Sequence, residues 1–178
     1  MDVADQKQRP INNSYWVEQG KLLAGEYPAG RNSNDTRKRL KKFLDAGIRT
    51  FINLTEAHEL PGYDGTVKEI ASEMGIHVLT TRSPIEDMHI PNDTTEMLRI
   101  LNMIEQSLND KQPVYVHCWG GIGRTGTVIG CYLVRQGLSG SEALDHLATL
   151  WPYMHKSKYF PHTPQTLTQF EYVTRWPE

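Results

Sequence analysis

The feature that most constrains the fold is a short stretch that joins an apolar run to a second apolar run through a glycine-rich loop. It reads Val-Tyr-Val-His-Cys-Trp-Gly-Gly-Ile-Gly-Arg-Thr-Gly over residues 114–126. The first run has the residues of a buried strand, and the almost wholly apolar run at 127–134 indicates a buried central helix. A strand that leads through a tight loop into a buried helix predicts an α/β domain with a central sheet flanked by helices.

The spacing within the loop predicts a phosphate site. Five residues separate Cys118 from Arg124, and a loop of that length lets backbone N–H groups point inward at phosphate oxygens. The positive end of the following helix adds to this field, and the Arg124 guanidinium matches two phosphate oxygens. In the same field Cys118 is expected to ionise to a nucleophilic thiolate. A thiolate beneath a phosphate cradle predicts attack on phosphorus.

Other interpretations of the same residues are weaker. A structural cysteine beside a tight turn does not explain why His117, four glycines and the hydroxyl of Thr125 accompany the cysteine. The stretch Gly121–Gly126 also matches G-x-G-x-x-G, the dinucleotide-binding fingerprint. That fingerprint opens a series of strand–helix units, whereas only about fifty residues follow here, with little strand pattern among them.

The pattern His-Cys-x-x-Gly-x-Gly-Arg-Thr-Gly resembles the signature of the protein tyrosine phosphatase superfamily, and most closely its dual-specificity branch. Residues 84–91, Pro-Ile-Glu-Asp-Met-His-Ile-Pro, resemble the general-acid loop of that family. Residues 15–28 resemble the start of small atypical dual-specificity phosphatases, and residues 163–170 resemble the terminal segment of the kinase-associated phosphatase group. The resemblance implies the cysteine phosphatase fold, a central mixed sheet of about five strands with helices on both faces.

The resemblance also implies a role for each site residue. Cys118 would form a cysteinyl-phosphate intermediate, and Asp87 would act first as general acid and then as base for water. Thr125 would donate its hydroxyl to the departing sulfur, while His117 would orient the loop and help to hold the thiolate. The phosphate would be bound by Trp119, Gly120, Gly121, Ile122, Gly123 and Arg124.

Several of these residues also have a purely structural interpretation. Asp87 could cap a loop N–H, Thr125 could be satisfied within its helix, and a histidine that ends a strand is often structural. Gln165 and Gln169 are candidates for positioning the hydrolytic water, although an exposed helix face explains them equally well. No metal and no cofactor are expected, because the loop and Arg124 already neutralise phosphate and the seven histidines form no ligand array.

Composition places the chain among compact globular domains. It has 178 residues, 38% of them hydrophobic and 22% charged, which predicts a flexible arm over 1–13 and a single catalytic domain over 14–178. A net charge of −2 gives no attraction to nucleic acid or membrane. Two cysteines, a polar N-terminus and no long apolar run suggest a cytoplasmic protein. A monomer is expected.

The substrate is less tightly constrained. Relatives that act on inositol lipids often carry lysine or arginine within the five-residue loop, and here those positions are uncharged. A phosphorylated protein is therefore the leading substrate, through phosphotyrosine or, with a shallow pocket, phosphoserine and phosphothreonine. Lys156 and Lys158 could reach an acidic substrate. An inositol lipid phosphatase, a non-catalytic phosphoprotein-binding module and a sulfurtransferase are the alternatives.

Hydrophobic patterns and capping signals predict the remaining elements. Strands are expected near 14–17, 21–24, 48–54, 76–80 and 113–117. A helix is expected over 34–46, and capping boxes at Asp93–Glu96 and Ser139–Glu142 predict two more. Thr163 and Pro164 have the pattern of the cap and first position of a last helix.

Overall fold

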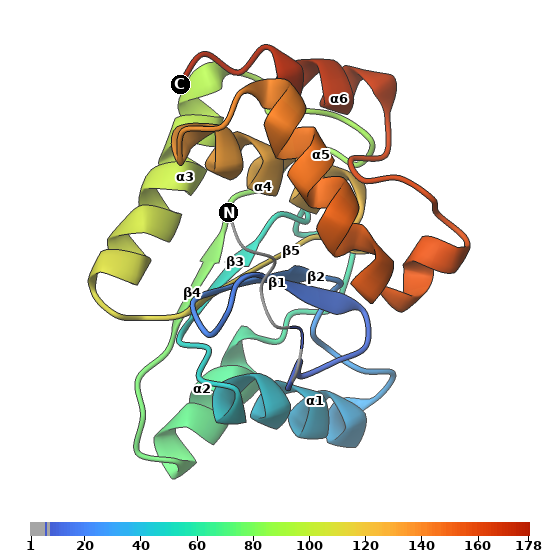
Figure 1. Ribbon diagram of the computed structural model, residues 1–178. Helices are drawn as coiled ribbons and strands as arrows, with labels where there is room; N and C mark the ends of the chain where they lie inside the picture. The colour runs from blue at the N-terminus through green and yellow to red at the C-terminus, as the bar shows by residue number, and fades with distance from the viewer. Residues whose placement is uncertain (1–5, 7) are drawn as a thin grey trace.

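The computed structural model describes residue 6 and residues 8–178, which form one sheet between two layers of helices (Figure 1). The strands are β1 (Ser14–Glu18), β2 (Leu22–Gly25), β3 (Thr50–Asn53), β4 (Leu79–Arg82) and β5 (Val114–His117). Their order is β1-β2-β5-β3-β4, in which β1 runs antiparallel to β2 and the other pairings are parallel. The mixed five-stranded sheet predicted from the sequence is confirmed.

Helices cover both faces of this sheet (Figure 1). One face carries α1 (Ser33–Asp45) and α2 (Asp64–Glu73), and the other carries α3 (Thr94–Asn109), α4 (Gly123–Arg135), α5 (Gly140–Leu150) and α6 (Leu167–Thr174). Two short 3-10 helices, η1 (Trp151–Tyr153) and η2 (His155–Lys158), follow α5. Each face has its own buried apolar cluster, and α4 is buried along almost its whole length, as the apolar run at 127–134 predicted.

The carboxyl ends of the parallel strands lie together at one end of the sheet. Gly25 and Asn53 both pair with His117, and Arg82 pairs with Asn53, so the last residues of β2, β5, β3 and β4 lie side by side. In open α/β sheets the loops that leave the carboxyl ends of parallel strands form the binding crevice. The loop of the Cys118 motif leaves the central one of these strands.

Three predictions about the elements are wrong in detail. The strand predicted at 76–80 lies at Leu79–Arg82. The last helix begins at Leu167 with Thr166 as its cap, because Thr166 and Gln169 form the capping box. Asp93 does cap α3, but the Glu96 carboxylate accepts from the Asn92 N–H instead of closing the box. The capping box at Ser139 is present as predicted.

The described part of the N-terminal segment contacts the domain. Gln6 exchanges two hydrogen bonds with the backbone of Trp16. Arg9 donates to the carbonyl oxygens of Ser14, at 2.7 Å, and of Tyr153, and Ile11 is buried. Residues 1–5 and 7 of the arm predicted over 1–13 lie outside the described residues. None of the helices that the structure describes has the length and apolar character needed to cross a membrane.

Candidate active site

Most carbonyl groups of the loop after β5 accept hydrogen bonds, whereas three of its N–H groups have no acceptor among the described residues. Four of its carbonyl oxygens accept a hydrogen bond: Cys118 from His117 Nδ1 at 3.2 Å, Trp119 from the Tyr27 N–H at 3.0 Å, Gly120 from Lys156 Nζ at 3.2 Å and Ile122 from Thr163 Oγ1 at 2.7 Å. Across residues 6 and 8–178, the N–H groups of Trp119, Gly120 and Ile122 have no acceptor. Unpaired N–H groups that converge in a turn form an anion-binding concavity.

Gly121 allows the loop to lie close to the end of β2. Its φ of +74° lies in the left-handed region, which favours glycine. A Cβ on this residue would stand 2.4 Å from the carbonyl carbon of Gly25. A side chain here would therefore push the loop away from the sheet edge.

The cysteine lies at the bottom of this cradle. Cys118 is 3% exposed, and its Sγ accepts a hydrogen bond from the Gly121 N–H at 3.2 Å. Thr125, in the first turn of α4, is buried, and its hydroxyl has no hydrogen-bond partner among the described residues. An unpaired buried hydroxyl is costly, so this one keeps a free donor next to the loop in sequence.

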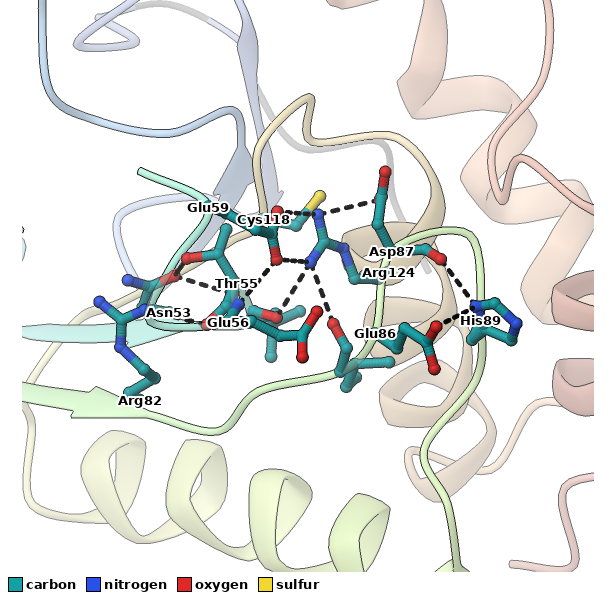
Figure 2. Close-up of polar contacts among 12 residues, drawn as sticks. Asn53, Thr55, Glu56, Glu59, Arg82, Glu86, Asp87, His89, Cys118 and Arg124 are labelled. Atoms are coloured by element: carbon teal, nitrogen blue, oxygen red, sulfur yellow. Dashed lines mark hydrogen bonds and ion pairs between the residues drawn. The ribbon is translucent and has the colours of Figure 1, made fainter. Parts of the chain in front are cut away.

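Arg124 lies between two carboxylates (Figure 2). Its two terminal nitrogens form a bidentate pair with Glu59 at 2.6 and 2.8 Å, and one of them also lies 2.9 Å from Asp87 Oδ1. The carbonyl of Ile85 accepts a further hydrogen bond at 3.0 Å. Burial opposes the charge, but the Glu59 hydrogen bonds and the charges of Cys118 and Asp87 raise the pKa of Arg124 above its ordinary value. The third guanidinium nitrogen, Nε, is buried without a partner in the described structure, which leaves its N–H free for an anion.

Asp87 enters the site on the loop between β4 and α3. Its side chain is 62% exposed yet reaches the guanidinium. The next residue, Met88, has a φ of +65°, which is unusual for a side chain of this kind. His89 Nδ1 donates to the Asp87 carbonyl at 2.7 Å, and Gln169 Nε2 donates to the His89 carbonyl at 2.9 Å. The loop is therefore tied to α6.

His117 is fixed beneath the loop as a neutral imidazole. A carbonyl oxygen only accepts, so Nδ1 carries the proton that binds the Cys118 carbonyl, and Nε2 accepts from the Tyr63 hydroxyl at 2.7 Å. Burial, with the charges of Arg82 and Arg124, lowers the pKa of His117 to about 3. Among the described contacts the imidazole binds the backbone of Cys118 and not its sulfur.

The two candidate glutamines are placed differently. Gln169 is fully buried, and its Oε1 accepts from the N–H groups of Gln165 and Thr166 while its Nε2 binds the His89 carbonyl. Its amide is therefore occupied in joining α6 to the loop of Asp87. Gln165 is exposed, and its Cβ lies 3.2 Å from the point that a Cβ on Gly123 would take. Of the two, Gln165 is the one placed beside the cradle with a free amide.

Several residues that build the site are missed by sequence reasoning. In the sequence Glu59 stands out only because it follows His58, and the pair lacks the spacing of a metal site. In the structure Glu59 holds Arg124 from the loop after β3. Tyr63 orients His117. Thr163 has the pattern of a helix cap, but its hydroxyl instead binds the Ile122 carbonyl of the glycine-rich loop. The only available signal was that Glu59 follows a buried strand whose end lies beside that of β5.

No group of three or more metal-ligating side chains occurs in the described part of the chain.

Comparison with known proteins agrees with this geometry. Residues 26–138 match the family described as "Polymorphic toxin system, DSP-PTPase phosphatase". The chain belongs to this family. It is thus a small atypical member of the dual-specificity branch of the protein tyrosine phosphatase superfamily, as the motif at 117–126 indicated.

Individual relatives are distant. One relative is the "Phosphatidylinositol 3,4,5-trisphosphate 3-phosphatase and protein-tyrosine-phosphatase PTEN1" of Arabidopsis thaliana. The two sequences are 26% identical over 157 residues, which cover 83% of this chain and 36% of that protein. This chain is 25% identical to cyclin-dependent kinase inhibitor 3 of Rattus norvegicus, covering 82% and 73%. The solved structure of Tk-PTP in its active form superposes with a TM-score of 0.67 at 25% identity, covering 92% and 95%. The chain spans less than half the length of several curated relatives that it matches.

Proposed function

We propose that this chain is a cysteine-dependent phosphatase that hydrolyses phosphomonoesters on proteins, with phosphotyrosine as the leading substrate. The observation that carries the proposal is the cradle itself. Unpaired N–H groups of the loop and the unpaired Nε of Arg124 surround a buried cysteine sulfur that accepts a backbone N–H. Such an arrangement binds a tetrahedral oxyanion and places a nucleophile beneath it.

In the first step the substrate phosphate takes the free donors of the loop and of Arg124. Asp87 gives up its contact with Arg124, because the phosphate oxygens compete for the same nitrogen. Cys118 Sγ then forms a bond to phosphorus while the bond to the leaving oxygen breaks. The protonated carboxyl of Asp87 supplies the proton that the leaving oxygen needs.

The second step returns the enzyme to its starting state. Water, positioned by Gln165, attacks phosphorus, and the Asp87 carboxylate takes its proton. The sulfur–phosphorus bond breaks, with the Thr125 hydroxyl donating to the departing thiolate, and inorganic phosphate leaves. His117 serves as a positioning residue through the Cys118 carbonyl. The nucleophile works only as a reduced thiol, which fits a cytoplasmic setting.

Two observations bear on the substrate. The loop residues Trp119 to Gly123 carry no charge, and this favours a singly phosphorylated group over a highly phosphorylated lipid. The name of the Arabidopsis relative, however, includes an inositol lipid as well as protein tyrosine phosphatase activity. Phosphotyrosine, phosphoserine and phosphothreonine peptides and phosphoinositide vesicles should therefore be compared at equal enzyme concentration.

The first test is hydrolysis of p-nitrophenyl phosphate in EDTA by the wild type, Cys118→Ser and the matched control Cys131→Ser. Cys131 is buried in α4, and burial raises the pKa of its thiol, so it takes no part in the chemistry. We expect turnover to vanish only in Cys118→Ser. Equal activity in all three folded proteins would refute the nucleophile. A folded but inactive wild type that binds phosphopeptides would indicate a binding module, and thiocyanate release would indicate a sulfurtransferase.

The role of Asp87 is tested by the dependence on the leaving group. Asp87→Asn should lower kcat/KM for phenyl phosphate by about 100-fold or more, as expected for loss of a general acid, and much less for a substrate whose leaving group needs no proton. Glu86→Gln is the matched control, because Glu86 is on the same loop and pairs with His89 instead of Arg124. Equal small losses of kcat/KM on both substrates would show that Asp87 is not the general acid.

A further inference from the structure

A large cavity opens beside the catalytic loop and is not used by the proposed chemistry. Its volume is about 680 Å³, within the usual range for ligand sites. Its walls are the segment after β2, the start of α1, the loop 60–62 and Lys156. The cavity is therefore large enough for several side chains.

This cavity and the cradle share a wall. Trp119, the residue after the nucleophile, lines the cavity and is 54% exposed. Lys156 also lines it, and its ammonium donates to the Gly120 carbonyl. The exposed indole of Trp119 therefore lies in the wall of the cavity, and it offers a substrate a flat apolar surface with a polar edge.

The charges in the cavity leave one cation without a partner. Glu26 binds Lys156 Nζ at 2.7 Å and Arg39 at 3.1 Å, so two cations share one carboxylate. Asp35 accepts the backbone N–H of Arg31. Within the described residues, nothing accepts from the Arg31 guanidinium, which lies exposed at the rim. The cavity thus holds three cationic side chains against two carboxylates.

We infer that this cavity binds the polypeptide that flanks the phosphorylated residue, and that Arg31 selects an acidic side chain there. The inference rests on the proposed function and names the substrate class of the same site. A peptide fits better than a membrane surface, because Trp119 is the single exposed large apolar side chain in the lining, and the other exposed lining residues are polar or small: Arg31, Asn32, Ser33, Pro61 and Gly62. A surface that inserts into lipid needs exposed apolar side chains instead.

The test uses phosphotyrosine peptides in which one glutamate is scanned over the three positions on each side, each with a matched glutamine peptide. In the wild type, kcat/KM at one position should favour glutamate by about three- to fivefold, the size expected for one exposed ion pair. Arg31→Gln should abolish this preference and Arg31→Glu should reverse it. Arg99→Gln is the matched control: Arg99 is exposed on α3, which covers the opposite face of the sheet from α1.

Hydrolysis of p-nitrophenyl phosphate should be the same in the wild type and both Arg31 variants, because that substrate does not reach the cavity. The glutamate preference should also shrink as salt rises from about 0.05 to 0.5 M. A preference that survives in Arg31→Gln, a wild type without any preference, or faster turnover of phosphoinositide vesicles than of every peptide would overturn the inference. A wild type that does not hydrolyse p-nitrophenyl phosphate would instead overturn the proposed function.

Discussion

The buried imidazole of His117 should make the stability of this protein depend on pH. His117 is fully buried beneath the catalytic loop, where burial and the charges of Arg82 and Arg124 lower its pKa to about 3. In the unfolded chain the pKa returns to its ordinary 6.5. Between these two values the unfolded state binds a proton that the folded state does not. Stability is therefore complete above about pH 6.5 and is lost as the pH falls toward 3.

The size of the effect follows from this difference. One proton bound only by the unfolded state changes the free energy of unfolding by about 1.4 kcal/mol per pH unit. Integrated from pH 7 to pH 5, the His117 contribution is a loss of about 2 kcal/mol. At pH 5 a folded-state pKa of 3 or 4 gives almost the same loss, so the prediction depends only on the imidazole being neutral when folded.

The assay compares the wild type with His117→Asn by urea unfolding between pH 5 and 7, followed by tryptophan fluorescence. The amide introduced by this substitution keeps a donor near the Cys118 carbonyl but does not titrate. The variant will be less stable at every pH, so the readout is the change with pH and not the absolute value. The remaining histidines, including His146, whose pKa burial also lowers, are common to both proteins and cancel.

We expect the wild type to lose about 2 kcal/mol more than His117→Asn between pH 7 and pH 5. If the two proteins lose the same amount, the imidazole is not held neutral and the tautomer derived from Tyr63 and the Cys118 carbonyl is wrong. The same reasoning predicts that His117 contributes no ionisation to the pH profile of activity in this range.

Two further residues of the site give sharp predictions. Glu59→Gln removes the charge that holds buried Arg124. It should lower the free energy of unfolding by about 2 kcal/mol and kcat/KM for p-nitrophenyl phosphate by tenfold or more. Unchanged values, or equal losses in the neighbouring control Glu56→Gln, would show that Arg124 needs no such support. Thr163→Val removes the hydroxyl that fixes the Ile122 carbonyl and should cost about 1–2 kcal/mol in urea unfolding together with activity. Thr163→Ser should restore both, and a serine variant as impaired as the valine variant would exclude the hydrogen bond as the cause.

What could be predicted from the sequence is what is encoded locally. Cys118, the glycine-rich loop and Arg124 occupy seven consecutive positions that join strand β5 to helix α4. Their geometry is therefore set by one short segment. The buried helix α4 and the capping box at Ser139 are likewise properties of short segments.

What could not be predicted depends on contacts between distant segments. The partner of Arg124 lies 65 positions away. The residues around Glu59 indicate only that it follows a strand and not that its loop reaches α4. Thr163 has the pattern of a helix cap, but its hydroxyl binds the carbonyl of Ile122, 41 positions earlier, and the helix begins later. Helix α2 was not predicted individually, because its N-cap residue Tyr63 provides no side-chain cap.

The charges around Arg124 explain why an acid is needed beside this cradle. In the proposed mechanism the Cys118 thiolate joins Glu59 and Asp87 as a third negative charge beside a single guanidinium. A phosphate dianion adds further negative charge, and unscreened like charges in a partly buried site are costly. Glu59 is buried in its bidentate pair, whereas Asp87 is 62% exposed and holds Arg124 through one oxygen. In the proposed mechanism Asp87 is thus the group that leaves Arg124 to the phosphate and turns to the leaving oxygen as general acid.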